Sequence, residues 1–265
     1  MSAPAEIGVF GGSGFYSFLQ GTQEHVVTTP FGDPSAPLVT GEIDGRRVAF
    51  LPRHGTKHEF PPHRIPYRAN LWAMRELGVT RVLAPTAAGS LQKHVARGDF
   101  VVSDQIIDQT SGRPSTFYDG PETIHVSLAE PYCPTMRAVA IDKAHAAGIS
   151  VHAHGTVVVI EGPRFSTRAE SKWYSAMGWE VINMTQHPEA ALARELELCY
   201  CNISLITDYD AGVEGTSPVT VPEIIQVFND NNSRLSNLLR AVIPALPSSR
   251  DCACASALDG ARVGH

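Results

Sequence analysis

Two carboxylates that stand two residues apart directly follow an apolar run. Asp208 and Asp210 come after Ile203 to Ile206, and the i, i+2 spacing directs both side chains to the same side of an extended chain. Such a pair suits acid/base chemistry, because burial beside a second carboxylate raises the pKa of a carboxyl group. A helix N-cap or a turn cluster is the structural alternative for two neighbouring aspartates.

A guanidinium and an imidazole end a second apolar segment. Arg53 and His54 follow Val48 to Leu51 and precede Gly55. The permanently charged fork of an arginine at a strand end needs an anionic partner. That partner is either a bound anion or a carboxylate of the protein itself, and the sequence leaves both open.

Two loops of small and hydroxyl residues could complete an anion site. Gly11-Gly12-Ser13-Gly14 follows Ile7 to Phe10, and Thr86-Ala87-Ala88-Gly89-Ser90 follows another buried strand candidate. Such residues let backbone N–H groups and hydroxyls approach an oxyanion, so with Arg53 they resemble a phosphate cradle. The glycine loop has neither the lysine of a P-loop nor the Gly-x-Gly-x-x-Gly spacing. Taken alone, it is explained better by an ordinary strand-to-turn connection than by an anion site.

The scaffold for these segments is predicted from alternating strand and helix patterns. Apolar strand-like runs occur at 7–10, 48–51, 82–84, 100–102, 157–160, 181–183 and 203–206. Helical patterns occur at 67–77, 132–147, 167–177, 188–196 and 221–241. The alternation favours an α/β fold with a largely parallel or mixed sheet. Such sheets bind ligands just beyond the carboxyl ends of their strands, where the four segments above are expected.

Composition bounds the domain organisation and the function class. The 265 residues are 43% hydrophobic and 18% charged, and no compositional break divides 1–246, so we expect one domain with a small-residue, loosely packed tail over 247–265. The net charge of −6 gives no basic field for nucleic acid. Apolar runs fall short of the roughly 20 residues that cross a bilayer, and the N-terminal segment has no secretory pattern. We therefore expect a cytoplasmic protein without nucleic acid or membrane partners.

The cysteines favour thiols over a metal site. There are five: Cys133, Cys199, Cys201, Cys252 and Cys254. They are too few and too unevenly placed for a secreted disulfide scaffold. One residue separates the members of each close pair, whereas zinc sites usually have two to four residues between paired ligands. We expect no metal, and a local disulfide between Cys252 and Cys254 stays open.

Several longer motifs carry a resemblance to a known family. In chain order they are Pro30-Phe31-Gly32, Arg53-His54-Gly55, Thr86 to Leu91, Phe117-Tyr118-Asp119-Gly120, Glu161 to Ser166, Asn183-Met184-Thr185 and Thr207 to Asp210. Up to about Leu246, the chain resembles the purine nucleoside phosphorylase superfamily and, within it, the 5′-methylthioadenosine phosphorylases. The resemblance implies a single-domain nucleoside phosphorylase fold with a central mixed β-sheet flanked by helices. It also implies that no metal or organic cofactor is needed and that inorganic phosphate is a co-substrate.

The resemblance also implies site residues. Phosphate would be held by Ser13, Arg53, His54, Thr86, the backbone amide of Ala87 and Thr185. The purine would contact Phe165 and Ser166, with Asp208 at its N7 and Asp210 near its 6-amino group, and Met184 would pack on the ribose. The pocket for the 5′ group would combine Val221 and Ile224 of one chain with His125 of the next. A homotrimer is implied.

The implied reaction is phosphorolysis of 5′-methylthioadenosine to adenine and 5-methylthioribose 1-phosphate, in purine and methionine salvage, with Asp208 as general acid. An ionised Asp210 accepts a hydrogen bond from the 6-amino group of adenine and disfavours a 6-oxo group. Phosphorolysis of 5′-methylthioinosine or 6-oxopurine nucleosides remains an alternative, since Gln186 and His187 stand where smaller or apolar residues are expected. His187 before Pro188 also suits a helix start. A nucleosidase that uses water is disfavoured, because water needs no cationic fork, and a catalytically silent nucleoside-binding module remains open.

Overall fold

A mixed β-sheet forms the centre of the molecule. The computed structural model describes residues 4–11, 19–213 and 220–263. Its sheet has eleven strands: β1 (Ile7–Phe10), β2 (Gln20–His25), β3 (Leu38–Ile43), β4 (Arg46–Leu51), β5 (Arg81–Ser90), β6 (Phe100–Val101), β7 (Gln105–Gln109), β8 (Val151–His152), β9 (Thr156–Ile160), β10 (Val181–Asn183) and β11 (Cys199–Tyr209). Strands β4, β1, β5 and β11 pair in parallel, whereas β3 pairs with β4, and β10 with β5, in antiparallel fashion. The predicted mixed sheet is confirmed.

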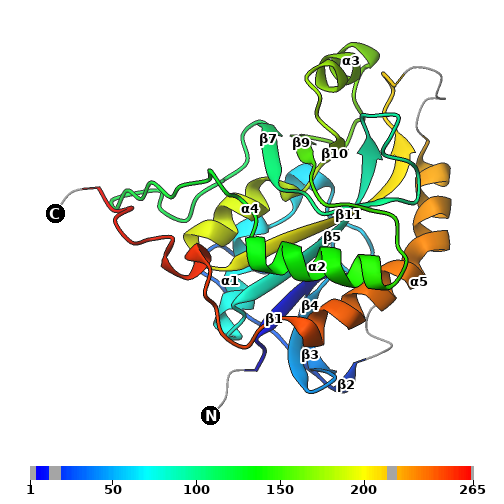
Figure 1. Cartoon of the computed structure of the whole chain (residues 1–265). Helices are drawn as coiled ribbons and strands as arrows, with labels where there is room; N and C mark the ends of the chain where they lie inside the picture. Colours follow the sequence, from blue (N-terminus) through cyan, green and yellow to red (C-terminus); the bar gives the residue numbers. More distant parts are fainter. Residues whose placement is uncertain (1–3, 12–18, 214–219, 264–265) are drawn as a thin grey trace.

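Helices cover both faces of this sheet (Figure 1). They are α1 (Tyr67–Glu76), α2 (Pro134–Ala146), α3 (Arg168–Ala176), α4 (Gln186–Glu195) and α5 (Val221–Ala245), with short 3₁₀ turns η2 (Pro62–Arg64) and η3 (Ala253–Ser256). Side chains of β5 alternate between the faces: Val82 packs with α1 and α4, and Leu83 packs with α2 and α5. The α/β arrangement with flanking helices is therefore as predicted.

Strands with polar, exposed faces were not predicted. β2 is almost wholly exposed, and β7 is exposed or half-buried along its length, so neither shows an apolar run. The helices begin and end within a few residues of their predicted bounds. At α3, Thr167 and Glu170 form a capping box, because the Thr167 hydroxyl accepts from the Glu170 N–H while the Glu170 carboxylate accepts from the Thr167 N–H.

The C-terminal tail packs against the domain, so the expectation of loose packing is wrong for its described part. The buried Arg81 guanidinium donates to the carbonyls of Ser248 and Ser249, at 3.2 and 2.7 Å. Farther along, Arg250 donates to the Glu197 carbonyl at 2.7 Å. In all three bonds, an arginine side chain donates to a backbone carbonyl of the tail or of the domain. Such bonds need no regular pattern of apolar residues in the tail, so the sequence pattern does not reveal them.

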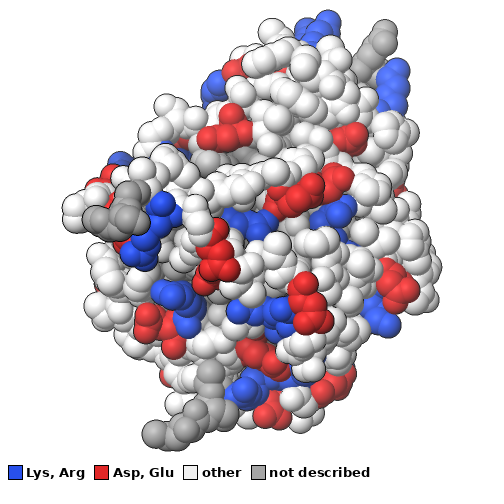
Figure 2. All heavy atoms as spheres, turned by 60° about the vertical axis from the view of Figure 1, so that its left-hand side comes forward, with Lys and Arg blue, Asp and Glu red and all other residues white. Residues whose placement is uncertain are grey.

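Charges are mixed on the surface drawn in Figure 2. Acidic and basic side chains are interspersed there, so this face offers a polyanion no continuous basic surface. Among the described residues, every helix is too short or too polar to cross a membrane.

One buried arginine links the loops around the carboxyl ends of the strands. The Arg113 guanidinium donates to the Tyr67 hydroxyl at 3.1 Å and to the carbonyls of Met184 and His187 at 2.9 and 2.7 Å. It also donates to the Glu161 carbonyl at 2.6 Å and pairs with its carboxylate at 3.2 Å. The planar fork therefore joins the segments that follow β7, β9 and β10.

Arg113→Lys should lower the free energy of unfolding by about 2–4 kcal/mol, because an ammonium group cannot replace the fork and leaves buried acceptors without donors. The change in unfolding free energy is measured by urea denaturation, with tryptophan fluorescence as the readout. Arg262→Lys is the control, since Arg262 is 66% exposed in its ion pair with Glu122 and should change the value by less than about 0.5 kcal/mol. Equal unfolding free energies for wild type and Arg113→Lys would contradict this role.

Candidate functional site

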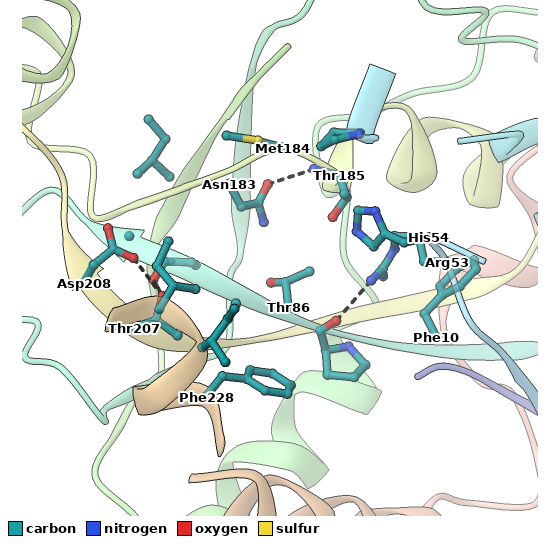
Figure 3. Close-up of a pocket in the computed structure, with 18 of the residues that line it drawn as sticks. Phe10, Arg53, His54, Thr86, Asn183, Met184, Thr185, Thr207, Asp208 and Phe228 are labelled. Atoms are coloured by element: carbon teal, nitrogen blue, oxygen red, sulfur yellow. Dashed lines mark hydrogen bonds between the residues drawn. The ribbon is translucent and has the colours of Figure 1, made fainter. Parts of the chain in front are cut away.

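A cavity of about 590 Å³ opens at the carboxyl ends of the central strands. Its walls come from the ends of β1, β4, β5, β10 and β11 and from the first turns of α5. In Figure 3, Asp208 lies on one side of the cavity, Arg53, His54 and Thr185 lie on the other, and Thr86 lies between them. This is the location that the sequence predicts for a ligand site.

The acidic side of the cavity is built by an irregularity in β11. The pairing of β11 with β5 shifts register between Ile206 and Asp208, which places the Asp208 carboxylate over Gly89. A Cβ atom at position 89 would lie 3.0 Å from Asp208 Oδ2 and from Ile182 Cγ2, so a larger residue there would push on the Asp208 carboxylate. The Thr207 hydroxyl donates to Asp208 Oδ1 at 2.7 Å.

Burial makes Asp208 a weak acid. The residue is 5% exposed, and burial, reinforced by the neighbouring Asp210 charge, raises the pKa of its carboxyl group to about 6. A carboxyl group with this pKa can hold a proton near neutral pH and give it to a ligand. The acid/base interpretation of the pair is therefore supported by the geometry.

Asp210 lies just beyond β11 with hydrogen-bonding capacity to spare. Its backbone N–H donates to the Ser90 carbonyl at 2.9 Å, and burial raises the pKa of its carboxyl group. Neither Asp210 Oδ2 nor the Ser166 hydroxyl has a partner in good hydrogen-bond geometry among the described residues, although Ser171, the Ala211 N–H and Ser166 lie close enough to the carboxylate to lower its pKa. Buried polar atoms rarely stay unpaired, so a polar ligand group is the natural partner for Asp210.

The cationic side of the cavity is held by a residue that the sequence did not suggest. Glu189 is fully buried at the start of α4. Its carboxylate accepts hydrogen bonds from Arg53 Nε at 2.5 Å and from Arg53 Nη2 at 3.1 Å. It also accepts from the Tyr200 hydroxyl at 2.8 Å. The Arg53 guanidinium lies 4.5 Å over the Phe10 ring and still lines the cavity. The carboxylate alternative for Arg53 is therefore confirmed. The guanidinium also faces the ligand space, and a bound anion there stays a prediction.

His54 faces the cavity as a neutral imidazole. Its Nδ1 lies 2.9 Å from the Phe60 carbonyl, which can only accept, so the ring proton is on Nδ1. Burial lowers the pKa of His54 to about 4, with the Arg53 charge adding to the effect. Nε2 is thus left as an acceptor, and it suits a ligand that carries a hydroxyl proton.

A chain of buried hydroxyls and one amide orients Thr86. The Ser204 hydroxyl donates to Asn202 Oδ1 at 2.8 Å, and Asn202 Nδ2 donates to Thr86 Oγ1 at 3.1 Å. Because Thr86 Oγ1 accepts from Asn202, its own proton is left for Ser204 Oγ, at 3.2 Å, or for a ligand in the cavity. Thr86 is therefore set up as a donor.

Most of the predicted site residues meet in this one cavity, and their individual roles stay predictions. The lining includes Arg53, His54, Thr86, Ala87, Phe165, Met184, Thr185, Asp208, Asp210 and Ile224. Ser166, Val221 and His125 do not line the cavity of their own chain. Ser13 lies outside the described residues.

Gln186 and His187, which depart from the family motif, contact other protein groups rather than the cavity. His187 has non-helical backbone angles inside α4, and its Nε2 lies 3.1 Å from an Asp108 carboxylate oxygen. Gln186 is buried and accepts from the Tyr132 hydroxyl. Neither residue lines the cavity, and both lie at the beginning of α4.

Sequence comparison places the chain among phosphorylases. A sequence model described as the phosphorylase superfamily matches residues 6–244. The chain is 54% identical to a purine nucleoside phosphorylase of Streptomyces coelicolor, covering 98% of this chain and 96% of that one. It is 50% identical to an S-methyl-5′-thioadenosine phosphorylase of Thermofilum pendens, over 97% of this chain and 98% of that one.

Solved structures agree in fold. A methylthioadenosine phosphorylase from Schistosoma mansoni in complex with adenine superimposes with a TM-score of 0.91 at 35% identity, covering 98% of this chain and 99% of that one. A methylthioadenosine phosphorylase from an antarctic soil metagenomic library gives 0.93 at 38% identity, over 99% and 93% of the two chains. The resemblance expected from the motifs is confirmed, and the chain belongs to the phosphorylase superfamily.

Proposed function

We propose that this chain cleaves 5′-methylthioadenosine with inorganic phosphate, giving adenine and 5-methylthioribose 1-phosphate. The observation that carries the proposal is the polarity of the cavity: a carboxyl group that can hold a proton lies on one side, and an arginine with several hydrogen-bonding groups lies on the other. A purine leaving group and an attacking phosphate need these two surroundings on opposite sides of one sugar. No metal or organic cofactor enters the proposed reaction.

The purine would lie along Phe165, between the two aspartates. Asp208 would give its proton to N7 as the glycosidic bond breaks and its electron pair moves to the base. The unpartnered Oδ2 of Asp210 would accept a hydrogen bond from the 6-amino group, with the Ser166 hydroxyl nearby. Adenine is favoured by this arrangement.

Phosphate would be held by directed hydrogen bonds at the cationic side. Arg53 and the Thr86 and Thr185 hydroxyls would donate to its oxygens, together with the Ala87 amide and Ser13. The Nε2 atom of His54 would accept a hydrogen bond from the hydroxyl of hydrogen phosphate, which keeps its proton. One phosphate oxygen would then bond to C1′ of an oxocarbenium-like ribose packed on Met184.

The 5′ group would enter an apolar pocket completed by a second subunit. Ile224 lines the cavity, while Val221 and Ile225 at the start of α5 are each 55% exposed in the single chain. Apolar side chains so exposed beside a ligand cavity suit a subunit interface. The proposed assembly is a cytoplasmic homotrimer in which His125 of a neighbouring chain closes the pocket.

A 6-oxopurine phosphorylase is the second candidate, on the strength of one relative. The Streptomyces coelicolor protein, 54% identical, is named a purine nucleoside phosphorylase. The carboxylate of Asp210 argues against a 6-oxo group, which offers it only lone pairs. Comparing kcat/KM for 5′-methylthioadenosine and 5′-methylthioinosine decides between them, and a preference for the inosine compound would overturn the adenine assignment.

Base release should depend on phosphate. Purified protein should liberate adenine from 5′-methylthioadenosine only when phosphate is present, and equal release without phosphate would identify a nucleosidase instead. The double variant Arg53→Met with Glu189→Gln removes both buried charges together. It should weaken phosphate binding by roughly 10- to 150-fold, because phosphate loses one charge-assisted hydrogen bond. Arg46→Met with Glu6→Gln is the control, since it removes another Arg–Glu ion pair, at 2.6 Å, that does not line the cavity, and it should leave phosphate binding unchanged.

The pH dependence of kcat/KM should follow Asp208. A general acid acts in its protonated form, so activity should fall as pH rises above the Asp208 pKa of about 6. Asp208→Asn should lower kcat by about 10²- to 10⁴-fold and abolish this falling limb. Phosphate ionisation affects all variants alike, and Asp210→Asn should keep the limb. An unchanged limb in Asp208→Asn would rule out its role as the acid.

Ile224 should select the methylthio group. An apolar pocket favours methylthio over hydroxyl by about 1–3 kcal/mol, so kcat/KM for 5′-methylthioadenosine should exceed that for adenosine by roughly 10- to 200-fold. Ile224→Ser should narrow the ratio, mainly by harming the better substrate. Val227→Ser, on the same helix but outside the cavity lining, should leave it unchanged. If both variants keep the wild-type ratio, Ile224 serves packing only.

A further inference from the structure

Four of the five cysteines meet at one point away from the cavity. Cys133 directly precedes α2, Cys199 begins β11, and Cys252 and Cys254 lie in the C-terminal tail at η3. Their Sγ atoms all lie within 4.8 Å of one another. Figure 1 shows η3 beside the start of α2. Segments distant in sequence thus bring their sulfurs together.

We propose that Cys133, Cys199, Cys252 and Cys254 bind one structural zinc ion. Tetrahedral zinc with Zn–S bonds of about 2.3 Å holds its sulfurs about 3.8 Å apart. Here Cys252 Sγ lies 3.7 Å from Cys133 Sγ and 3.4 Å from Cys199 Sγ. All are free thiols, and these separations exceed the bond of about 2.05 Å that a disulfide requires. Four sulfur ligands and no open position are typical of structural zinc.

The cluster is shielded from solvent, and a helix N-terminus favours the negative charge that a zinc tetrathiolate carries. Cys133, Cys199 and Cys254 are buried, and Cys252 is half-buried. The N-terminal end of the 13-residue α2 faces the cluster and offsets part of the net −2 charge of a zinc tetrathiolate. Zinc binding would release the four thiol protons to solvent.

The expectation of no metal was drawn from spacing within each close pair, and spacing is a poor guide here. Only Cys252 and Cys254 act as a pair, and the other two ligands come from remote segments. Cys201 stays outside the cluster: it is fully buried, and its Sγ lies 3.8 Å from the Asn202 carbonyl. Because Cys201 lies in β11 two residues after Cys199, it is a matched control for Cys199.

The zinc would fix the tail, and the tail holds a segment near the proposed subunit interface. Beyond the cluster, Arg262 forms a β-bridge with Ile124, and the His125 N–H donates to the Ala261 carbonyl at 2.8 Å. The Val263 N–H donates to the Thr123 carbonyl at 3.1 Å. Releasing the tail should therefore loosen residues 122–125. The link from this segment to the 5′ pocket rests on the proposed function, whereas the zinc site does not.

Metal analysis tests the site without reference to activity. Protein purified with a reductant and without chelators should contain about one zinc per chain, released when a mercurial reagent titrates the thiols. Replacement by Co²⁺ should give thiolate-to-cobalt charge-transfer absorption and the visible bands of tetrahedral cobalt. Protein that contains iron instead, that binds neither zinc nor cobalt, or that forms a disulfide within the cluster would overturn the proposal.

Matched variants locate the ligands. Cys254→Ser and Cys199→Ser should lose the zinc, lower Tm by more than about 5 °C and speed amide hydrogen exchange in residues 122–125 and 258–263. Cys201→Ser should keep its zinc and the wild-type exchange in both segments. Should a cluster variant fail to fold, the cobalt spectrum of the wild-type protein still decides. Zinc retained in both folded cluster variants would also overturn the assignment.

Discussion

The buried ion pair between Arg53 and Glu189 is the interaction on which the cavity depends. It joins the end of β4 to the start of α4, so it fixes the distance between two walls of the site. A lone guanidinium at this depth would be strongly unfavourable, and a carboxylate that takes both ends of the fork offsets the cost of burial. The pair carries no net charge. A bound phosphate would therefore be held by aimed donors rather than by excess positive charge, which is how preorganised sites stabilise anions.

The same buried setting gives three carboxylates different tasks. Glu189 receives hydrogen bonds from Arg53 and Tyr200, so its charge is compensated. Asp208 receives one from Thr207 and lies near a second carboxylate, and its pKa rises to about 6. Asp210 keeps one oxygen unpaired. Burial and the neighbouring groups, more than residue type, separate an orienting group, an acid and an acceptor.

Sequence patterns located the strand ends but not what lies behind them. Arg53 and Asp208 could be found because each follows an apolar run, and strand ends meet at one edge of the sheet. The expectation of a loop over 86–90 is wrong, because β5 continues to Ser90 and presents Thr86 to the cavity from within the strand. Glu189 could not be paired with Arg53, since the contact spans distant segments. Its one local signal is an acidic residue at the head of the apolar stretch Ala190 to Ala193. The tail was misjudged because Arg81 holds it through carbonyls, which hydrophobic patterns do not record.

In the proposed trimer, the tail and the cavity of a neighbouring chain would meet through the segment that carries His125, although they lie apart within one chain. Within one chain this residue contacts the tail rather than the cavity, while Val221 and Ile225 remain exposed at the cavity edge. In the proposed trimer, each chain would supply an apolar edge and receive a histidine from its neighbour. The precision of that contact would depend on how firmly the tail holds residues 122–125. Packing remote from the reacting atoms would thus help set selectivity for the 5′ group.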